Sequence, residues 1–357
     1  MLKGNKGEWS EIYAFCYLLA KGVLRSADKD LNPRSEFYPI LKIIREEIKN
    51  QIINYCPCCP DWNEVKIYSG NNLLKTVPRY EIDTVVGTLL NKIPEGERAF
   101  EIPEVEDFFD NIYVKKLKAD SAHKQDIDIQ IEDSRSGFSP ICGFSIKSYL
   151  GAKPTLINPG KNTNFIFNIS NCSQNVLEQT NSIDTRTKII DRIKFLNDNG
   201  CVIACTDEIV SSQFKENLEF VDSRMPEILS HVLLVAYKSG KKRISEAVEL
   251  VKQQNPLHYS NVNMYEYKIK KMLCACALGM TPEKVWEGAE DANGGYIVVK
   301  RDGSVLCYHI YNRNDFEQYL YDYTCFDTPS TSRYEYMTVY SENEQYKIKL
   351  NLQVRFI

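Results

Sequence analysis

The stretch over residues 124–150 constrains the fold more than any other part of the chain, because polar and apolar residues alternate within it. Residues 126–131 and 141–147 each have the period of two that is typical of a half-buried β-strand, and a polar loop containing Gly and Pro separates them. We expect a hairpin with one apolar and one polar face. The polar face would carry Asp126, Asp128 and Gln130 from the first strand and Ser145 and Lys147 from the second.

In this hairpin an acid and a lysine would lie side by side over a hydrophobic core. A Mg²⁺-dependent phosphodiesterase needs such a pair, because a carboxylate holds the metal and a lysine acts near the attacking water or the scissile phosphate. The alternative requires no catalysis, since a polar outer face is the usual state of a half-exposed antiparallel sheet.

The N-terminal segment predicts an amphipathic helix from Glu8 to about Leu24. Glu8 and Glu11 are three residues apart and would point in similar directions. Acids near the start of a helix can also be explained by the helix dipole alone. Lys3 and Lys6 are followed by these two acids rather than by a long apolar run, so the pattern of a secretion signal is not met and we expect a cytoplasmic protein.

Five segments of the chain resemble, in order, the HpaII family of type II restriction endonucleases: GNKGEWSEIY, KQDIDIQIED, GFSIKSYLG, TNFIF and KLNLQVRF. The resemblance covers the ends and the middle of the chain and suits its length of 357 residues. It implies a PD-(D/E)xK nuclease fold, Mg²⁺ as the cofactor and double-stranded DNA as the substrate, cut at the palindrome CCGG.

The motif residues of the family carry over one by one. Asp126 matches the metal-binding acid at the start of the first core strand, and Lys147 matches the lysine on the second. Ser145 stands where the usual pattern has Asp or Glu, and a neutral hydroxyl is a weaker metal ligand than a carboxylate. The resemblance therefore implies that another acid completes the metal site. The candidates are Glu11 first, Glu8 second and Asp128 third.

The expected catalytic set is Asp126, Glu11, Ser145 and Lys147. Asp126 and a glutamate would bind Mg²⁺ for in-line hydrolysis of the phosphodiester bond. Lys147 would orient or deprotonate the attacking water, or stabilise the charge that develops on the phosphate. Ser145 would hold a water of the metal or simply pack.

Residues 347–357 alternate almost without fault, with apolar side chains on one face. The other face offers only cationic and amide groups: Lys347, Lys349, Asn351, Gln353 and Arg355. Amide side chains can pair with adenine, Arg or Lys with guanine, and Lys with phosphate. We therefore expect a strand whose polar face points toward DNA. The alternative is an edge strand protected by lysine.

A polar turn over residues 327–334 places Arg333 after a run of small hydroxyl residues. A bidentate contact between arginine and guanine is the commonest specific contact in the major groove, and a CCGG reader needs guanine contacts. Arg333 is therefore the first candidate for base recognition. The alternative is a loop arginine that bridges acids.

The overall charge argues against DNA binding. The net charge is −4 and the isoelectric point is about 5.8, so attraction would have to come from local basic clusters. The candidate clusters are Lys115, Lys116 and Lys118, then Lys241, Lys242 and Arg243, then Lys268, Lys270 and Lys271. No apolar run approaches the length of a membrane span, and no GxxxxGK[ST] motif points to an ATP-driven enzyme.

The chain has 12 cysteines, which we expect to be free thiols because nothing indicates secretion. The dense cluster Cys56-Pro57-Cys58-Cys59 lacks a second pair at the spacing of a zinc site.

We further expect a Lys- and Glu-rich helix near residues 39–53, a strand over 164–169, helices between 186 and 277, and a hairpin over 296–310 with Asp302-Gly303 at its turn. With the resemblance, the predicted fold is α/β (α+β). A PD-(D/E)xK nuclease core, with a mixed sheet flanked by helices, would occupy residues 1–180. A DNA-recognition region of helices and strands would occupy residues 181–357, with one compact body as the alternative.

Two functions stay open. The first is a sequence-specific, Mg²⁺-dependent endonuclease, and the second is a DNA-binding protein of the same fold whose catalytic site has decayed at Ser145. A palindromic target favours a homodimer, with a monomer that nicks each strand in turn as the alternative. The restriction interpretation also implies a companion DNA methyltransferase that protects the host's own sites without having to touch this protein.

Overall fold

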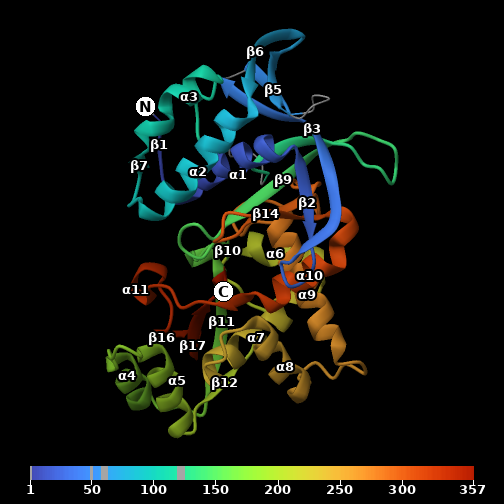
Figure 1. Ribbon diagram of the computed structural model, residues 1–357. Helices are drawn as coiled ribbons and strands as arrows, with labels where there is room; N and C mark the ends of the chain where they lie inside the picture. Colours follow the sequence, from blue (N-terminus) through green and yellow to red (C-terminus); the bar gives the residue numbers. More distant parts are fainter. Residues whose placement is uncertain (1, 49–50, 58–62, 119–124) are drawn as a thin grey trace. The chain divides into compact units, whose positions relative to one another are not determined.

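The computed structural model describes residues 2–48, 51–57, 63–118 and 125–357 (Figure 1). The chain divides into two compact units. Unit 1 comprises residues 1–154, 277–279 and 290–316, and unit 2 comprises residues 155–276, 280–289 and 317–357. Each unit contains its own β-sheets.

A mixed β-sheet forms the centre of unit 1. Within the described residues its strand order is β2-β14-β13-β9-β8-β3-β4-β5-β6. β9 pairs antiparallel with β8 and parallel with β13, which confirms the expected mixed sheet. The strands are β2 (Val23–Ala27), β3 (Pro33–Ile48), β4 (Gln51–Cys56), β5 (Glu64–Ser69), β6 (Asn72–Pro78), β8 (Ile127–Ile131), β9 (Ile141–Ser148), β13 (Gly295–Val299) and β14 (Val305–His309).

Both predicted hairpins are present in this sheet. β8 and β9 pair with Ile127 opposite Phe144, so their apolar side chains share one face and enter the core of unit 1. β13 and β14 form the second hairpin, and Gly303 lies in its turn at φ +83°, a conformation that favours glycine. The Tyr13 hydroxyl donates to the Gly303 carbonyl at 2.6 Å, which ties this turn to the N-terminal helix.

The predicted N-terminal helix is confirmed as α1 (Lys6–Lys21). The Asn5 side chain accepts the N–H of Glu8 at 3.1 Å, and Glu8 Oε2 accepts the N–H of Asn5 at 2.8 Å. This reciprocal capping box fixes where the helix begins, and Gly22 ends it in the left-handed conformation. Unit 1 also contains α2 (Arg79–Glu95), α3 (Glu106–Asn111) and the paired short strands β1 (Lys3–Gly4) and β7 (Phe100–Glu101).

The helix expected near residues 39–53 is wrong, because its described residues belong to β3 and β4. A register shift between Ile40 and Lys42 interrupts the strand's alternation. As a result Ile40 and Ile43 are both buried although they are three residues apart, a spacing that mimics a helix. Arg45 and Glu47 then continue the buried side of the strand with charged groups. The bulge and the two buried charged residues therefore explain why the sequence pattern did not indicate a strand.

Unit 2 contains two smaller sheets within the described residues, with strand orders β12-β11-β17-β16 and β10-β18-β15. The first includes β11, which confirms the strand predicted over residues 164–169. The strands are β10 (Thr155–Ile157), β11 (Asn164–Ser170), β12 (Val202–Ala204), β15 (Thr324–Phe326), β16 (Val339–Glu342), β17 (Gln345–Asn351) and β18 (Val354–Phe356).

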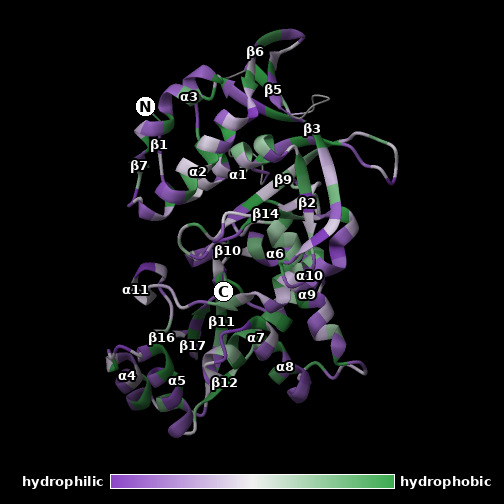
Figure 2. Ribbon diagram, in the orientation of Figure 1, coloured by the Kyte–Doolittle hydropathy of each residue, from purple (hydrophilic) through white to green (hydrophobic). Residues whose placement is uncertain are grey.

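Helices surround these strands and confirm the helical prediction between residues 186 and 277. Unit 2 holds α4 (Gln174–Ser182), α5 (Lys188–Asp198), α6 (Ser212–Val221), α7 (Met225–Ser239), α8 (Ile244–Gln254) and α11 (Thr331–Tyr334). The residues of α9 (Asn263–Leu278) and α10 (Arg313–Asp322) are divided between the two units. In Figure 2, α4 and α5 carry both hydrophilic and hydrophobic residues, as amphipathic helices do. None of the helices in the described ranges is long and apolar enough to cross a membrane.

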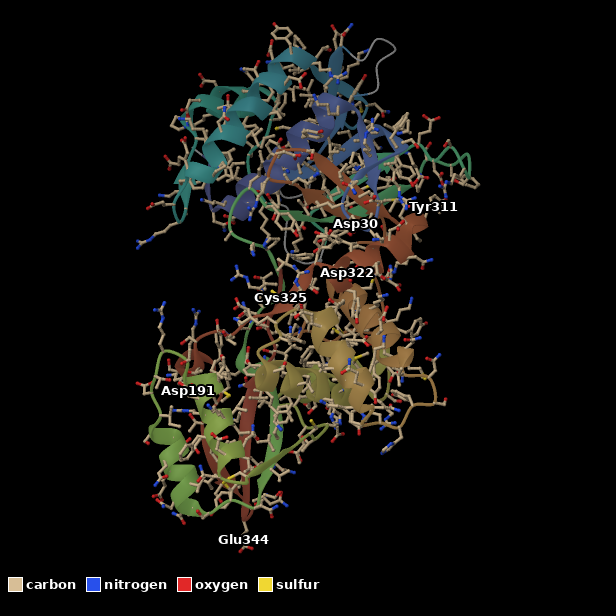
Figure 3. All side chains as sticks on the ribbon, turned by 60° about the horizontal axis from the view of Figure 1, so that its bottom comes forward. Asp30, Asp191, Tyr311, Asp322, Cys325 and Glu344 are labelled. Carbon is tan, nitrogen blue, oxygen red and sulfur yellow. A yellow bond between two sulfur atoms is a disulfide. The ribbon has the colours of Figure 1, made fainter. Side chains whose placement is uncertain are left out.

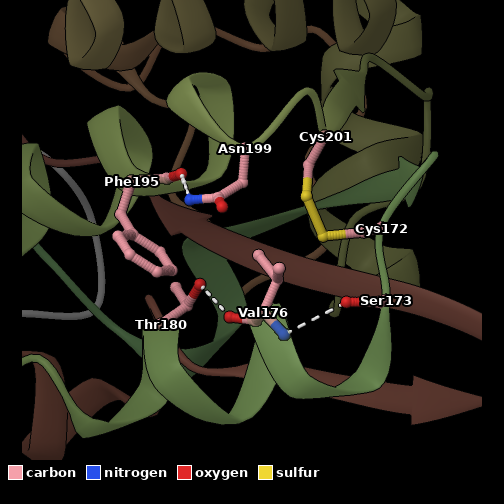
Figure 4. The surroundings of a disulfide bond; sticks show 7 residues. All are labelled: Cys172, Ser173, Val176, Thr180, Phe195, Asn199 and Cys201. Atoms are coloured by element: carbon pink, nitrogen blue, oxygen red, sulfur yellow. Dashed lines mark hydrogen bonds between the residues drawn. A yellow bond between two sulfur atoms is a disulfide. The ribbon is translucent and has the colours of Figure 1, made fainter.

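One pair of cysteines corrects the expectation of free thiols. Cys172 and Cys201 form a disulfide, with their Cα atoms 4.9 Å apart (Figure 4). This bond joins the residues that follow β11 to those that precede β12. Eight further cysteines of the described chain form no disulfide. Cys58 and Cys59 of the dense cluster lie outside the described residues.

The boundaries of the two compact units differ from the boundary near residue 180 that was expected between the nuclease core and the recognition region. The first segment of unit 1 ends at Pro154, and unit 1 also takes in residues 290–316 with the second hairpin. The mixed α+β class is confirmed. The assignment of the core to the PD-(D/E)xK fold stays a prediction, as does the division into a nuclease core and a recognition region.

Candidate active site

Asp126 lies one residue before β8 and beside β9. Its N–H donates to the carbonyl oxygen of Phe144 at 2.8 Å. Its Oδ2 accepts the N–H of Ile146 at 2.7 Å and the hydroxyl of Ser145 at 3.2 Å. The hairpin predicted from the alternation therefore fixes the Asp126 carboxylate against β9.

Ser145, which stands where an acid was expected, is 1% exposed. Its hydroxyl donates to the Asp126 carboxylate. This hydrogen bond is a role that sequence reasoning did not anticipate, since only packing or contact with a water was expected. The departure from the usual acid leaves the site with one charge fewer, but with an oriented Asp126.

Glu11, on α1, lies close enough to Asp126 for their charges to interact. Burial raises the pKa of Glu11 from its ordinary value of 4.5 to about 8, and the Asp126 carboxylate adds to the rise. The positive charges of Lys118, Lys147 and Arg45 oppose it. Glu11 Oε2 is buried and has no hydrogen-bond partner among the described groups. An acid in this state requires either a proton or a cation.

Lys147 is a half-buried residue of β9, two positions beyond Ser145. The parallel partner β13 places Val298 beside it. Because its charge lowers the pKa of Glu11, Lys147 belongs to the same site as the acids. The structure thus brings together the four residues expected to act in catalysis: Asp126, Glu11, Ser145 and Lys147.

The other two candidate acids are engaged locally. Glu8 Oε2 accepts the N–H of Asn5 in the capping box of α1. Asp128 Oδ1 accepts from Gln125 Nε2 at 3.0 Å. Gln125 lies directly over Gly143, where an added Cβ would come within 2.5 Å of its Oε1. These local roles favour Glu11, rather than Glu8 or Asp128, as the partner of Asp126.

The donor set fits a hard divalent cation, because carboxylate oxygens are the ligands that Mg²⁺ prefers. The partnerless oxygen of Glu11 and the neighbouring carboxylate of Asp126 supply two such ligands. Across the described ranges, no group of three or more His, Cys, Asp or Glu side chains is arranged to hold a metal ion.

Sequence reasoning missed a buried ion pair beside this site. Arg45 Nε donates to Glu47 Oε1, and the two side chains are 8% and 2% exposed. Arg45 Nη2 donates to the Lys116 carbonyl at 2.7 Å, and Glu47 Oε2 accepts the Lys115 N–H at 2.8 Å. The Arg45 guanidinium also lies 5.0 Å from the centre of the Phe15 ring on α1. The ion pair therefore joins β3, the segment of Lys115 and Lys116, and α1. In the sequence, the signal for it was a pair of opposite charges two residues apart among apolar residues.

The strand expected over residues 347–357 is wrong as a single strand. β17 ends at Asn351 and β18 begins at Val354, and each is an inner strand of its own sheet, so the edge-strand alternative is also wrong. Asn351 is fully buried, and its Nδ2 donates to Asn164 Oδ1 at 2.7 Å. Gln353 is 8% exposed. Burial takes both amides away from a surface that DNA could contact.

The cationic candidates are more accessible. Lys349 is half-buried. Arg355 is half-buried too, and its Nη1 donates to Asp327 Oδ2 at 3.1 Å. Arg333 lies on α11 and is exposed, as a base contact requires. The alternative role of Arg333, bridging acids, finds no ion pair within the described chain.

Ion pairs neutralise one of the predicted basic clusters. The pairs are Lys268–Asp222, Lys270–Glu266 and Lys271–Glu317, at 2.8, 2.6 and 2.7 Å. The other clusters also contain ion pairs among the described residues, Lys115 with Asp110 at 2.7 Å and Lys241 with Glu246 at 3.6 Å. The cluster on α9 is therefore a structural network rather than a free basic patch.

Comparisons with known proteins agree with this chemistry. The family described as HpaII restriction endonuclease matches residues 5–356. The chain is also 43% identical to the type II restriction enzyme HpaII of Haemophilus parainfluenzae over 359 residues, which cover 99% of this chain and 98% of that enzyme. No solved structure matches the chain. The protein is thus a type II restriction endonuclease, a site-specific deoxyribonuclease that acts on double-stranded DNA. The chain belongs to the HpaII restriction endonuclease family.

Proposed function

We propose that this endonuclease cuts DNA at CCGG by Mg²⁺-dependent in-line hydrolysis on a PD-(D/E)xK core. The observation that carries the proposal is the neighbourhood of Glu11 and Asp126, two carboxylates of which one has a buried oxygen without a hydrogen-bond partner, beside the cationic Lys147. The CCGG target follows from the resemblance to the HpaII family, since no residue here specifies it.

Asp126 and Glu11 are the residues that would hold the cation. When bound, Mg²⁺ supplies positive charge at the scissile phosphate and lowers the pKa of an attacking water. Lys147 keeps a second positive charge beside the acids, where it stabilises the negative charge that develops on the phosphate oxygens and orients the water. Ser145 holds the Asp126 carboxylate in place through its hydroxyl.

Glu11 can act as a ligand only in its ionised form. Because its pKa is raised to about 8, Glu11 of the free protein carries a proton over much of the neutral range and must release it when a cation binds. Metal affinity should therefore increase with pH until Glu11 is ionised.

We assign the guanine contact to Arg333, and further DNA contacts to Lys349 and Arg355, because these are the accessible cations among the predicted readers. We leave Asn351 and Gln353 out of the contact surface because they are buried. Two copies acting as a homodimer match a palindrome best. Sedimentation of the protein with a single CCGG duplex would separate this from the monomer that nicks each strand in turn.

We place the enzyme in the cytoplasm together with a companion methyltransferase that protects the host's DNA. The test of the activity is incubation of the purified protein with plasmid DNA, with Mg²⁺ and with EDTA, followed by sequencing of fragment ends. The proposal predicts discrete fragments, only with Mg²⁺, whose ends all fall within CCGG. Intact DNA in both tubes with specific retention of CCGG duplexes would instead support a decayed site that only binds.

A further inference from the structure

Unit 2 contains a cavity of about 480 Å³ that the active site does not use. Three segments far apart in the sequence line it: residues 186–190 at the start of α5, residues 236, 237, 240 and 242 at and after the end of α7, and residues 326 and 328–332. Part of its wall is apolar and includes Tyr237 and Phe326. The polar turn predicted to carry Arg333 thus forms one side of a concave surface.

The charged residues of this lining have one sign. They are Arg186, Lys188 and Lys242, and the lining contains no Asp or Glu. Lys188 pairs with Asp184 at 2.9 Å, and Lys242 is near enough to Asp327 to lower the pKa of that carboxyl, which also accepts from Arg355. Arg186 is exposed and forms no ion pair within the described chain. In a chain of net charge −4, the lining itself carries cations and no acid, with Asp184 and Asp327 beside two of those cations.

Hydroxyl groups accompany the cations. The lining includes Thr187, Thr328, Ser330, Thr331 and Ser332. The nearest acid on α5, Asp191 (labelled in Figure 3), accepts hydrogen bonds from Thr185 and Thr187, so its charge is engaged by its own segment. Cations together with Ser and Thr hydroxyls are the groups that proteins direct at DNA phosphates and sugars.

We propose that this cavity seats the sugar–phosphate backbone of the substrate duplex, with Arg186 and Lys242 as phosphate contacts. The lining ends at Ser332, and Arg333 follows directly, so the base contact assigned to Arg333 would lie beside the seated backbone. Beside its apolar wall the lining carries three cations and five Ser or Thr residues, the groups that a phosphate and sugar backbone would meet. The inference rests on the proposed function, because it takes the substrate of that function as the occupant.

The test measures binding of two labelled duplexes, one with CCGG and one without, over a series of salt concentrations in EDTA so that no cleavage occurs. The variants are Arg186→Gln, Lys242→Gln and the double variant. Lys194→Gln is the matched control, because Lys194 is an exposed cation on the same helix α5 that does not line the cavity. Arg186→Lys keeps the charge and should largely restore binding.

We expect the double variant to weaken both duplexes equally, by about tenfold at low salt, and to reduce the slope of log affinity against log salt by about two. Lys194→Gln should leave both quantities near the wild type. An unchanged slope in a double variant that melts like the wild type would overturn the cavity as a DNA site, even if the wild type binds CCGG tightly. If the wild type binds neither duplex, the proposed recognition of CCGG through Arg333 is overturned as well. Cleavage at CCGG is then tested by the plasmid assay alone.

Discussion

The candidate active site in unit 1 and the candidate DNA-contact surface in unit 2 differ in how far their charged side chains are exposed to solvent. In unit 1 the partnerless Glu11 oxygen and the Arg45–Glu47 pair at the candidate active site are buried, and Asp126 and Lys147 are half-buried. In unit 2 the cations Arg186 and Arg333 are exposed beside a concave surface. Catalysis needs a few groups in a fixed field, whereas DNA binding needs cations that can meet phosphates from solution. We therefore propose that the two tasks are assigned to groups of different exposure, catalysis to buried groups of unit 1 and DNA binding to exposed cations of unit 2.

The largest expected effect is a loss of cleavage rate with little change in DNA affinity. Lys147→Ala should lower the cleavage rate by about three orders of magnitude, because it removes the positive charge beside the two acids. Binding of a CCGG duplex in EDTA should stay within a factor of about three of the wild type. Asp128→Asn is the matched control in the same hairpin, since Asp128 is held by Gln125, and should cut nearly normally. Normal cleavage by Lys147→Ala would remove Lys147 from the mechanism.

The second prediction concerns the buried charges of unit 1. Arg45→Met leaves Glu47 buried without its partner, so the free energy of unfolding should fall by about 3–5 kcal/mol. Urea unfolding measures this loss. Removing both charges, in Arg45→Met with Glu47→Leu, should recover part of it because no unpaired charge is left. A single variant as stable as the wild type would show that the pair does not hold the three segments together.

The third prediction moves to the exposed cations of unit 2. Arg333→Ala should weaken binding of the CCGG duplex by about 1–3 kcal/mol while changing binding of unrelated DNA little. Competition binding with both duplexes measures the difference. Equal weakening of the two duplexes would make Arg333 a phosphate contact like those proposed for Arg186 and Lys242.

The smallest expected effect separates the two N-terminal glutamates. Glu8→Ala should lower stability by about 1 kcal/mol, because it removes half of the capping box of α1. The Mg²⁺ concentration needed for half-maximal cleavage should not change. A large rise in that concentration would place Glu8, rather than Glu11, in the metal site.

The hairpin of β8 and β9 was predictable because its alternation is a local pattern. The same pattern predicted that Asp126, Ser145 and Lys147 lie near one another. β3 was missed because a bulge and the buried residues Arg45 and Glu47 broke the pattern that a strand usually shows. Alternation tells which side chains share a face, but not what covers that face.

The C-terminal residues illustrate this limit. Asn351 belongs to the polar side of the pattern, yet the backbone carbonyl of Gly160 and the side chains of Thr163 and Asn164 surround its amide inside unit 2. The cavity could not be foreseen at all, because its three segments are brought together only by the fold.

The central claim is that Glu11 and Asp126 form a cation site, and unfolding against pH tests it most directly. The raised pKa means that folded protein keeps on Glu11 a proton that the unfolded chain releases above about pH 4.5. Stability in EDTA should therefore fall as the pH rises from about 4.5 to about 8, and level off above that. Glu11→Gln should lack this part of the fall.

The decisive comparison is the melting temperature of wild type and Glu11→Gln at a pH slightly above 8, with and without Mg²⁺. The account predicts that Mg²⁺ raises the melting temperature of the wild type, because it compensates the two neighbouring carboxylates, and raises that of Glu11→Gln much less. Equal stabilisation of both proteins by Mg²⁺ would contradict the account, because the cation would then be bound without Glu11.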